Sequence, residues 1–319
     1  MRPSVENGAR EALENRQAKL LYLLPIVAAP LLMFAAAFVI IPSKWFALRA
    51  GNTYMANLGY GAKLNGRDCQ VLVYGDSTAM VGADPKVIAK KSGLTACNIA
   101  EFGGVTLVSG TEPVDKFLSQ NPRPKYIVFL YAPEGLSRPF AWEHVGFFEA
   151  ITYRVREEHT LGTAWTLATH PGPTLGWAEQ GLRMALTRVK SKPISDEKAR
   201  VRERDLGQLK VVNIPDLQSC SMPTRLYEPD PTWIAGLRSK YSGNGTTVVV
   251  DATPVMNCDQ GIPFYQAHLA GLVDDLPLPQ YPVTDYADEH GQRMHMNAKG
   301  AAKVSAMIGE QIRAMQGGR

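Results

Sequence analysis

Residues 20–41 form the only long apolar run in the chain, and none of them is charged. As a helix of 22 residues the run would be about 33 Å long, close to the thickness of a bilayer core. The basic residues Arg10, Arg16 and Lys19 precede it, which favours a cytoplasmic location for the N-terminal segment, residues 1–19. We therefore expect a single transmembrane anchor at residues 20–42.

This topology places everything after the anchor outside the cytoplasm, as in a single-pass protein of a bacterial inner membrane with a periplasmic domain. A cleaved signal peptide is the alternative interpretation. The apolar run is unusually long for a signal peptide, and no clear A-x-A cleavage site follows it. Residues 43–68 are polar and contain scattered glycines, and we expect them to be a linker.

Short apolar runs alternate with amphipathic segments in the domain that we expect at residues 69–319. Strands are expected at 69–74, 94–99, 125–131 and 246–251. Helices are expected at 86–92 and 111–120 and from the cap Asn297 to about Met315. This alternation predicts an α/β fold, a three-layer sandwich in which helices cover both faces of a mostly parallel sheet.

Residues 139–235 interrupt the alternation, and we interpret them as an inserted helical lobe or lid. The charge run 195–205 inside it is typical of a solvated helix or loop face. The aromatic-rich segment 140–148 is suited to stacking on sugars, although packing inside the lobe is the more usual role. Residues 257–285 are rich in Pro, Gly and Asp and are expected to be loop.

The composition excludes several classes of function. The net charge is only +4, and no basic stripe with interleaved aromatic residues is visible, so nucleic acid is not an expected partner. Neither a lysine-bearing phosphate loop nor metal-ligand spacing is visible, so we expect no cofactor and no metal. An extracytoplasmic domain can form one or two disulfides, and Cys220–Cys258 is the preferred pair because both residues lie beside turn-forming residues. Four buried thiols, Cys69 and Cys97 included, are the alternative.

The tripeptide Gly75-Asp76-Ser77 directly follows the first expected strand. Active sites of open α/β sheets form at the carboxyl ends of strands, where backbone N–H groups can hold an oxyanion. A serine needs an adjacent base, and His295 lies just before the last helix. We therefore predict Ser77 as nucleophile and His295 as its base, with His290 as the next candidate and Asp76 as a structural residue.

Three blocks of sequence resemble the SGNH, or GDSL-like, hydrolase superfamily. They are residues 71–78 (VLVYGDST), 98–104 (NIAEFGG) and 294–301 (MHMNAKGA). The resemblance covers roughly residues 70–136 and 244–313, and it implies a flavodoxin-like three-layer sandwich and an acyl-serine intermediate. It also implies an oxyanion hole built from the backbone N–H groups of Ser77 and of Gly103 or Gly104.

Two positions depart from the family pattern. The family carries an Asp three residues before its catalytic His, where this chain has Gln292. Asp288 is the preferred third member of the triad, Asp285 is the alternative acid, and Glu289 is a further option. The family also has an Asn shortly after the third strand, and residues 129–135 contain none.

A single span joined to an altered SGNH domain resembles the accessory proteins of bacterial polysaccharide O-acetylation. The expected function is an extracytoplasmic O-acyltransferase that acetylates a cell-surface or secreted polysaccharide. One span cannot carry an acyl group across a membrane, so a multi-span membrane acyltransferase is the expected donor and partner. Two alternatives stay open: a membrane-tethered carbohydrate esterase or deacetylase, and a non-catalytic assembly or binding subunit of an exopolysaccharide complex.

Overall fold

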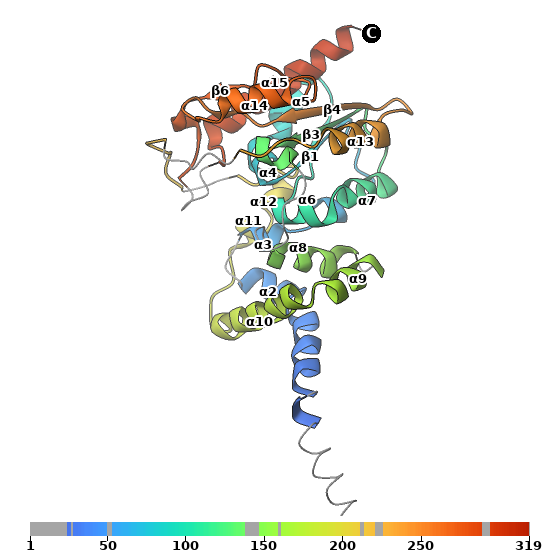
Figure 1. Cartoon of the computed structure of the whole chain (residues 1–319), viewed down its shortest axis with the longest axis vertical. Helices are drawn as coiled ribbons and strands as arrows, with labels where there is room; N and C mark the ends of the chain where they lie inside the picture. Colours follow the sequence, from blue (N-terminus) through green and yellow to red (C-terminus); the bar gives the residue numbers. More distant parts are fainter. Residues whose placement is uncertain are drawn as a thin grey trace, which may run out of the picture.

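A four-stranded parallel sheet forms the centre of the chain, with strand order β2-β1-β3-β4 (Figure 1). The strands are β1 (Val71–Gly75), β2 (Ala96–Asn98), β3 (Tyr126–Tyr131) and β4 (Thr247–Ala252). They lie within the segments in which strands were expected, except that β1 and β4 each end one residue later, and the predicted α/β class with a parallel sheet is confirmed. The computed structural model describes residues 24–26, 28–49, 53–137, 147–158, 161–210, 214–220, 226–288 and 294–318.

Helices cover both faces of the sheet because successive strand residues point to opposite sides. Leu72 and Tyr74 face α7 (Glu112–Gln120), α13 (Pro231–Tyr241) and α14 (Ile262–Leu269). Val71 and Val73 face a second group of helices. These are α4 (Ser77–Gly82), α5 (Pro85–Ser92) and α15 (Ala298–Gly317).

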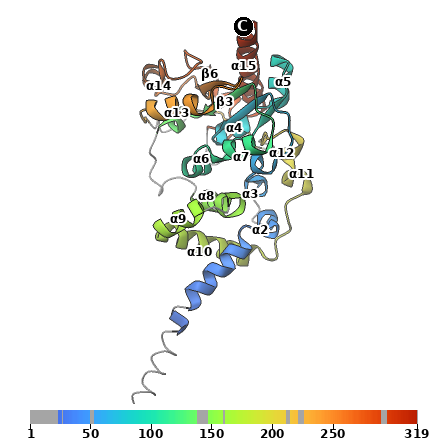
Figure 2. The same ribbon diagram turned by 90° about the vertical axis from the view of Figure 1, so that its right-hand side faces the viewer.

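The described residues between 147 and 204 form a helical lobe. It consists of α8 (Phe147–Tyr153), the π-helical turn η3 (Arg154–Glu158), α9 (Leu161–Thr169), α10 (Pro171–Arg188), α11 (Asp196–Ala199) and α12 (Val201–Arg204). Figures 1 and 2 show α8, α9 and α10 between the sheet domain and an N-terminal helix that includes residues 28–40. Ala37, Ile41, Phe148 and Trp177 pack together in a core of their own.

The segment expected to be a linker is folded instead. Residues 43–68 contain α2 (Lys44–Arg49), α3 (Thr53–Asn57) and the 3₁₀ helix η1 (Gly61–Lys63). Phe46, Met55 and Leu58 of this segment are buried in the core of the helical lobe. The linker interpretation was wrong because the partners that bury these side chains lie about a hundred residues further along the chain.

The expected loop at residues 257–285 also contains regular structure. It holds α14, the strand β6 (Gln280–Tyr281) and the 3₁₀ helix η4 (Val283–Asp285), and β6 pairs in parallel with β5 (Val255–Met256), which lies just before the segment. A proline stands in the first turn of α14, where its missing N–H removes no helical hydrogen bond. The proline content therefore marked the start of a helix as well as loops.

Two disulfides join the four cysteines. Cys220–Cys258 is present as predicted, and Cys69–Cys97 ties the chain two residues before β1 to β2. The charge run 195–205 is only partly solvated, because Arg202 and Asp205 are buried.

None of the helices in the described part of the chain is both long enough and apolar enough to cross a membrane. Residues 1–23 and Val27, which include part of the predicted anchor, lie outside the described residues. The same holds for residues 140–146 of the aromatic-rich segment and for Glu289, His290 and Gln292.

Candidate active site

Ser77 is the first residue of α4, directly beyond the carboxyl end of β1. The strand lies between β2 and β3, so the chain crosses the sheet at this point, where open α/β sheets place their ligands. Gly75 allows β1 and β3 to approach closely, because a Cβ at this position would lie 1.6 Å from the Leu130 carbonyl oxygen. The serine therefore stands at the predicted edge of the sheet.

Asp76 holds the turn that presents Ser77. Its carboxylate accepts hydrogen bonds from the Thr78 N–H at 2.9 Å, the Thr78 hydroxyl at 2.5 Å and the Ala132 N–H at 2.9 Å. Burial raises the pKa of the Asp76 carboxyl, and these hydrogen bonds and the charge of His295 lower it in part. The structural role predicted for Asp76 is confirmed.

The second sequence block, residues 98–104, continues to pair with β1 for a few residues after β2 ends. The Ile99 N–H donates to the Val73 carbonyl at 2.8 Å, and the Glu101 N–H donates to the Gly75 carbonyl at 3.0 Å. Gly103 follows two residues later as the first residue of α6 (Gly103–Ser109). The first N–H groups of a helix have no partner inside it, so α4 and α6 begin at one edge of the sheet with donors available to an oxyanion. Gly104, the other predicted donor, is buried.

The side chain of Asn98 stabilises this edge of the sheet and is not one of the proposed oxyanion donors. Its amide donates to the Ala79 carbonyl at 2.8 Å and to the Ala83 carbonyl at 2.9 Å, and its Oδ1 accepts from the Ala100 N–H at 2.9 Å. It thereby ties α4 to the end of β2.

His295 lies in the loop before α15, and only 2% of its surface is exposed. Asn297 caps α15 by accepting from the N–H groups of Lys299 and Gly300. The helix packs on α4, where the Ser305 hydroxyl donates to the Gly82 carbonyl at 3.1 Å. His295 is therefore held beside the turn that carries Ser77, although no hydrogen bond between these two side chains is among those of the described residues.

Tyr54 is a site residue that sequence reasoning missed. It comes from α3, in the expected linker. Its ring centroid lies 4.7 Å from that of Phe102, directly before Gly103, and 6.5 Å from that of His295. Tyr54 thus bridges the second block and the histidine, and no local motif indicates this.

The two candidate acids occupy different surroundings. Asp285 is buried, and its carboxylate forms an ion pair with Lys303 of α15. Asp288 is half-buried, and its backbone N–H donates to the Pro215 carbonyl at 2.8 Å. Within the described residues neither carboxylate is hydrogen-bonded to His295, so the geometry leaves Asp288 available and Asp285 engaged elsewhere.

A pocket opens between the serine and histidine blocks. It leaves about 450 Å³ between its walls, including the part open to solvent. Thr78, the neighbour of Ser77, and Met294, the neighbour of His295, both line it. Glu134, Thr253 and the Cys220 end of a disulfide complete parts of the wall. Neither Ser77 nor His295 is itself among the described residues that line it.

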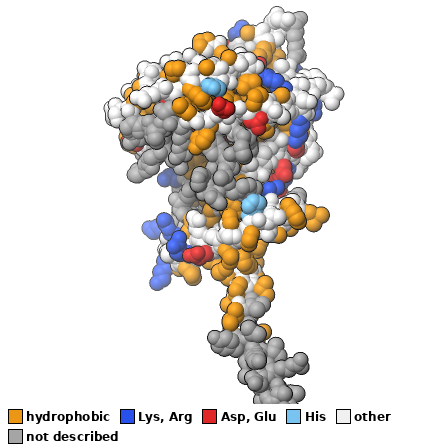
Figure 3. Space-filling view, viewed as in Figure 1, with side chains coloured by type: hydrophobic (Ala, Val, Ile, Leu, Met, Phe, Trp, Pro, Cys, Tyr) orange, Lys and Arg blue, Asp and Glu red, His pale blue; other side chains and the backbone are white. Residues whose placement is uncertain are grey.

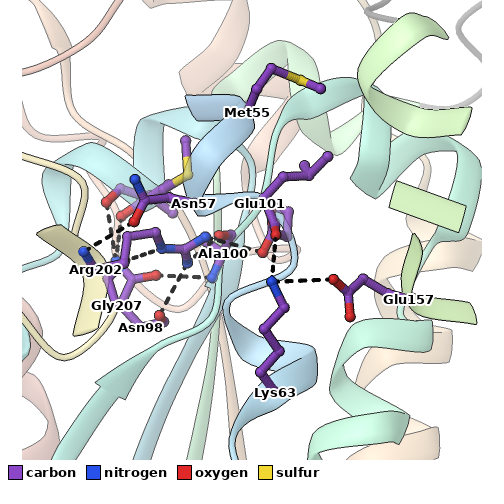
Figure 4. A network of polar contacts seen from close by, with 12 residues as sticks. Met55, Asn57, Lys63, Asn98, Ala100, Glu101, Glu157, Arg202 and Gly207 are labelled. Atoms are coloured by element: carbon purple, nitrogen blue, oxygen red, sulfur yellow. Dashed lines mark hydrogen bonds and ion pairs between the residues drawn. The ribbon is translucent and has the colours of Figure 1, made fainter. Parts of the chain in front are cut away.

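The loop that carries Gly103 is clamped from the inserted lobe by Arg202 (Figure 4). Arg202, on α12, is fully buried and donates to the Ala100 carbonyl at 2.7 Å and the Gly207 carbonyl at 2.6 Å. It also pairs with Glu101 at 3.0 Å. Burial raises the pKa of the Glu101 carboxyl, and the Arg202 charge lowers it in part.

Comparisons of the chain with protein-family models, with curated proteins and with solved structures find no match. In the described ranges, no group of three or more His, Cys, Asp or Glu side chains is arranged to hold a metal ion. The case for function therefore depends on the sequence blocks and on the geometry of this pocket.

Proposed function

We propose that this chain is a membrane-anchored, extracytoplasmic SGNH-type O-acyltransferase that acetylates a bacterial polysaccharide through an acyl-serine intermediate. The observation that carries the proposal is the pocket lined by both Thr78 and Met294, the sequence neighbours of Ser77 and His295. Two blocks more than two hundred residues apart thus share one cavity at the carboxyl edge of the sheet. Serine acyl transfer needs the nucleophile and its base at one site, and the shared cavity supports that requirement.

The reaction would proceed in two steps. In the first, the Ser77 oxygen attacks the acyl carbon of an ester donor while His295 accepts the serine proton. The bond to the donor oxygen then breaks, and His295 returns the proton to the leaving alcohol. In the second, a sugar hydroxyl attacks the acyl-serine, His295 takes its proton, and Ser77 is released with its hydroxyl restored.

Backbone donors would stabilise the negative oxygen in both steps. The N–H groups of Ser77 and of Gly103 begin α4 and α6 at the same edge of the sheet. Removing one such donor typically costs about 100- to 1000-fold in turnover, so the clamp on the Gly103 loop matters for rate. The lack of an Asn after β3 makes these two donors more important.

The anchor at residues 20–42 supports the choice of a polysaccharide acceptor. It would hold the domain at the outer surface of the inner membrane, where exported glycan passes. A multi-span membrane acyltransferase would supply the acyl group from the cytoplasm. The resemblance to accessory proteins of polysaccharide O-acetylation supports the same assignment.

The test is the acetyl content of cell-surface and secreted polysaccharide in cells that carry Ser77→Ala. We expect a loss of acetylation with normal protein level. Ser119→Ala makes the same chemical change on the exposed surface of α7 and should leave acetylation intact. Unchanged acetylation in the Ser77→Ala strain would contradict the proposal. Rapid hydrolysis of an aryl acetate without transfer to an added oligosaccharide would favour a carbohydrate esterase instead.

A second candidate, a non-catalytic assembly or binding subunit, is favoured by one observation. Two positions that the family uses for catalysis are altered here, because Gln292 stands in place of the family's Asp and residues 129–135 lack its Asn. Labelling with a fluorophosphonate separates the two candidates, because only an activated Ser77 reacts.

A further inference from the structure

Exposed apolar side chains are concentrated at the end of the molecule farthest from the sheet. In the described residues, twelve of the fourteen large apolar side chains that are exposed belong to residues 24–45 and 161–189. Figure 3 shows apolar side chains along the N-terminal helix and on the lobe next to it. A soluble surface spreads such residues singly, so a concentration of this kind indicates an interaction surface.

The polar and apolar side chains of α9 are distributed largely in reverse of those of a helix at a water-exposed surface. Its outward side chains include Leu161, which is 91% exposed, and Trp165, which is 71% exposed. Its buried side chains are Thr163 and Thr166, and the Thr166 hydroxyl accepts a hydrogen bond from Arg154 at 3.0 Å. Of its three large apolar side chains only Leu167 packs partly against the core of the lobe, so α9 turns two of the three outward, which matches apolar surroundings.

The helix α10 continues the same surface. Leu175 and Leu186 of α10 are exposed, while Trp177 and Gly181 face the core of the lobe. A Cβ at Gly181 would lie 2.1 Å from Cδ1 of Ile41, which shows how closely α10 lies against the end of the N-terminal helix. Figures 1 and 2 agree that α9 and α10 lie beside the base of that helix.

Basic residues surround the apolar ones. Residues 24–49 and 161–192 contain six Lys or Arg and one acidic residue, Glu179. The guanidinium of Arg49 lies 5.8 Å from the centre of the Trp45 ring and donates to the Ser191 carbonyl at 2.7 Å. Tryptophan beside basic side chains is typical of proteins at the boundary of an anionic bilayer.

We propose that the α9–α10 face, formed by Leu161, Trp165, Leu175, Leu186 and Val189, lies on the surface of an anionic phospholipid bilayer. The inverted pattern of α9 accounts for contact with acyl chains, and the basic residues account for contact with lipid phosphate. The inserted lobe is then a membrane platform between the bilayer and the sheet domain. This inference extends the proposed membrane attachment and does not depend on Ser77 chemistry.

A bilayer fits this face better than a protein partner for a geometric reason. The apolar N-terminal helix leaves the molecule beside α10, with Leu31, Leu32 and Val39 exposed along it. Any membrane that receives this helix would reach the α9–α10 face at its base. The apolar side chains of α9, α10 and the N-terminal helix would thus all contact the same bilayer.

The test uses nitroxide labels on the full-length chain reconstituted in vesicles of phosphatidylethanolamine and phosphatidylglycerol. All four native cysteines form disulfides, so a single introduced cysteine can be labelled. Leu161→Cys and Leu186→Cys report on the proposed face, and Leu32→Cys reports on the anchor alone. Arg313→Cys, exposed on α15 in the sheet domain, is the matched control.

We expect labels at positions 161 and 186 to be relaxed more by dissolved oxygen than by a water-soluble nickel chelate, and the label at 313 to show the opposite. Nickel accessibility at 161 and 186 equal to that at 313 would overturn the inference, even if the label at 32 is lipid-exposed. Protection of 161 and 186 from both reagents would also overturn it, because it indicates a protein partner. Adding Ser77→Ala should leave all four signals unchanged, which separates this result from the acyl-transfer proposal.

Discussion

The Asp76 carboxylate accepts a hydrogen bond from the backbone N–H of Ala132 at 2.9 Å, and so joins the turn after β1 to the loop after β3. Gly135 lies close against the same carboxylate, since a Cβ at Gly135 would lie 2.7 Å from Asp76 Oδ2. Ala132 and Thr78 both line the pocket, so the position of the pocket wall depends on this carboxylate.

Asp76→Ala should therefore destabilise the fold and distort the pocket. The substitution removes the cap of α4 and leaves the buried N–H groups of Thr78 and Ala132 without their acceptor, at an expected cost of about 2–4 kcal/mol. Thr78→Val is the matched control, because it removes only one hydroxyl donor and should cost about 1 kcal/mol. Urea denaturation of the three proteins measures both values. Equal stabilities for the two variants would refute the role given to Asp76.

A pair of matched variants can identify the third member of the triad. Asp285 is engaged with Lys303, whereas Asp288 makes no ion pair among the described residues. We expect Asp288→Asn to slow acylation of Ser77 by an aryl acetate about 100-fold or more, since the imidazole loses its orienting acid. Asp285→Asn should leave that rate nearly unchanged and lower the midpoint of thermal unfolding. The opposite ranking of the two rates would assign the acid to Asp285.

Arg202 and Glu101 form a fully buried ion pair, and breaking it should be costly. Arg202→Met leaves the Glu101 carboxyl buried without its partner and removes donors from three backbone carbonyls, which predicts a loss of about 3–5 kcal/mol. The double variant with Glu101→Gln should recover part of that loss, because no buried charge is left unpaired. Chemical denaturation of the double-mutant cycle measures the coupling.

A matched control for this cycle is available on the same helix. Arg204 is half-exposed and pairs with the exposed Glu197 and with the buried Asp205, which keeps Lys86 and Lys210 as partners, so Arg204→Met should cost much less than Arg202→Met. A cost for Arg202→Met no larger than that for Arg204→Met would show that the buried clamp contributes little to folding.

Local sequence signals predicted the sheet domain well. The strand cores are continuous apolar runs, and three of the nearby helices begin with a capping residue, at Asp84, Asp230 and Asn297. These signals act over a few residues, so they are readable without the fold. The serine and histidine blocks could be placed at one edge for the same reason, because the ends of parallel strands meet there.

The parts of the structure that could not be predicted from the sequence depend on contacts between residues far apart in the chain. Met55 and Tyr54 appear in a polar stretch, and their burial depends on helices distant in the chain. Arg202 lies in a charge run and is buried only because the loop after β2 offers carbonyls and a carboxylate to it. Neither residue carries a pattern that separates it from its solvated neighbours.

Asp251 on β4 provides a test of stability against pH. Burial raises the pKa of its carboxyl to about 7, and the charges of Asp274 and Asp275 add to this effect. Between about pH 4 and pH 7 the folded chain keeps a proton at Asp251 that the unfolded chain releases, so stability from this group falls as pH rises through that window. The full fall is of the order of 4 kcal/mol. Asp251→Asn can preserve the acceptor for the Asp275 N–H and removes the titration. Urea denaturation near pH 5 and pH 8 should therefore show a smaller pH difference for Asp251→Asn than for the parent, and an unchanged difference would place the titrating group elsewhere.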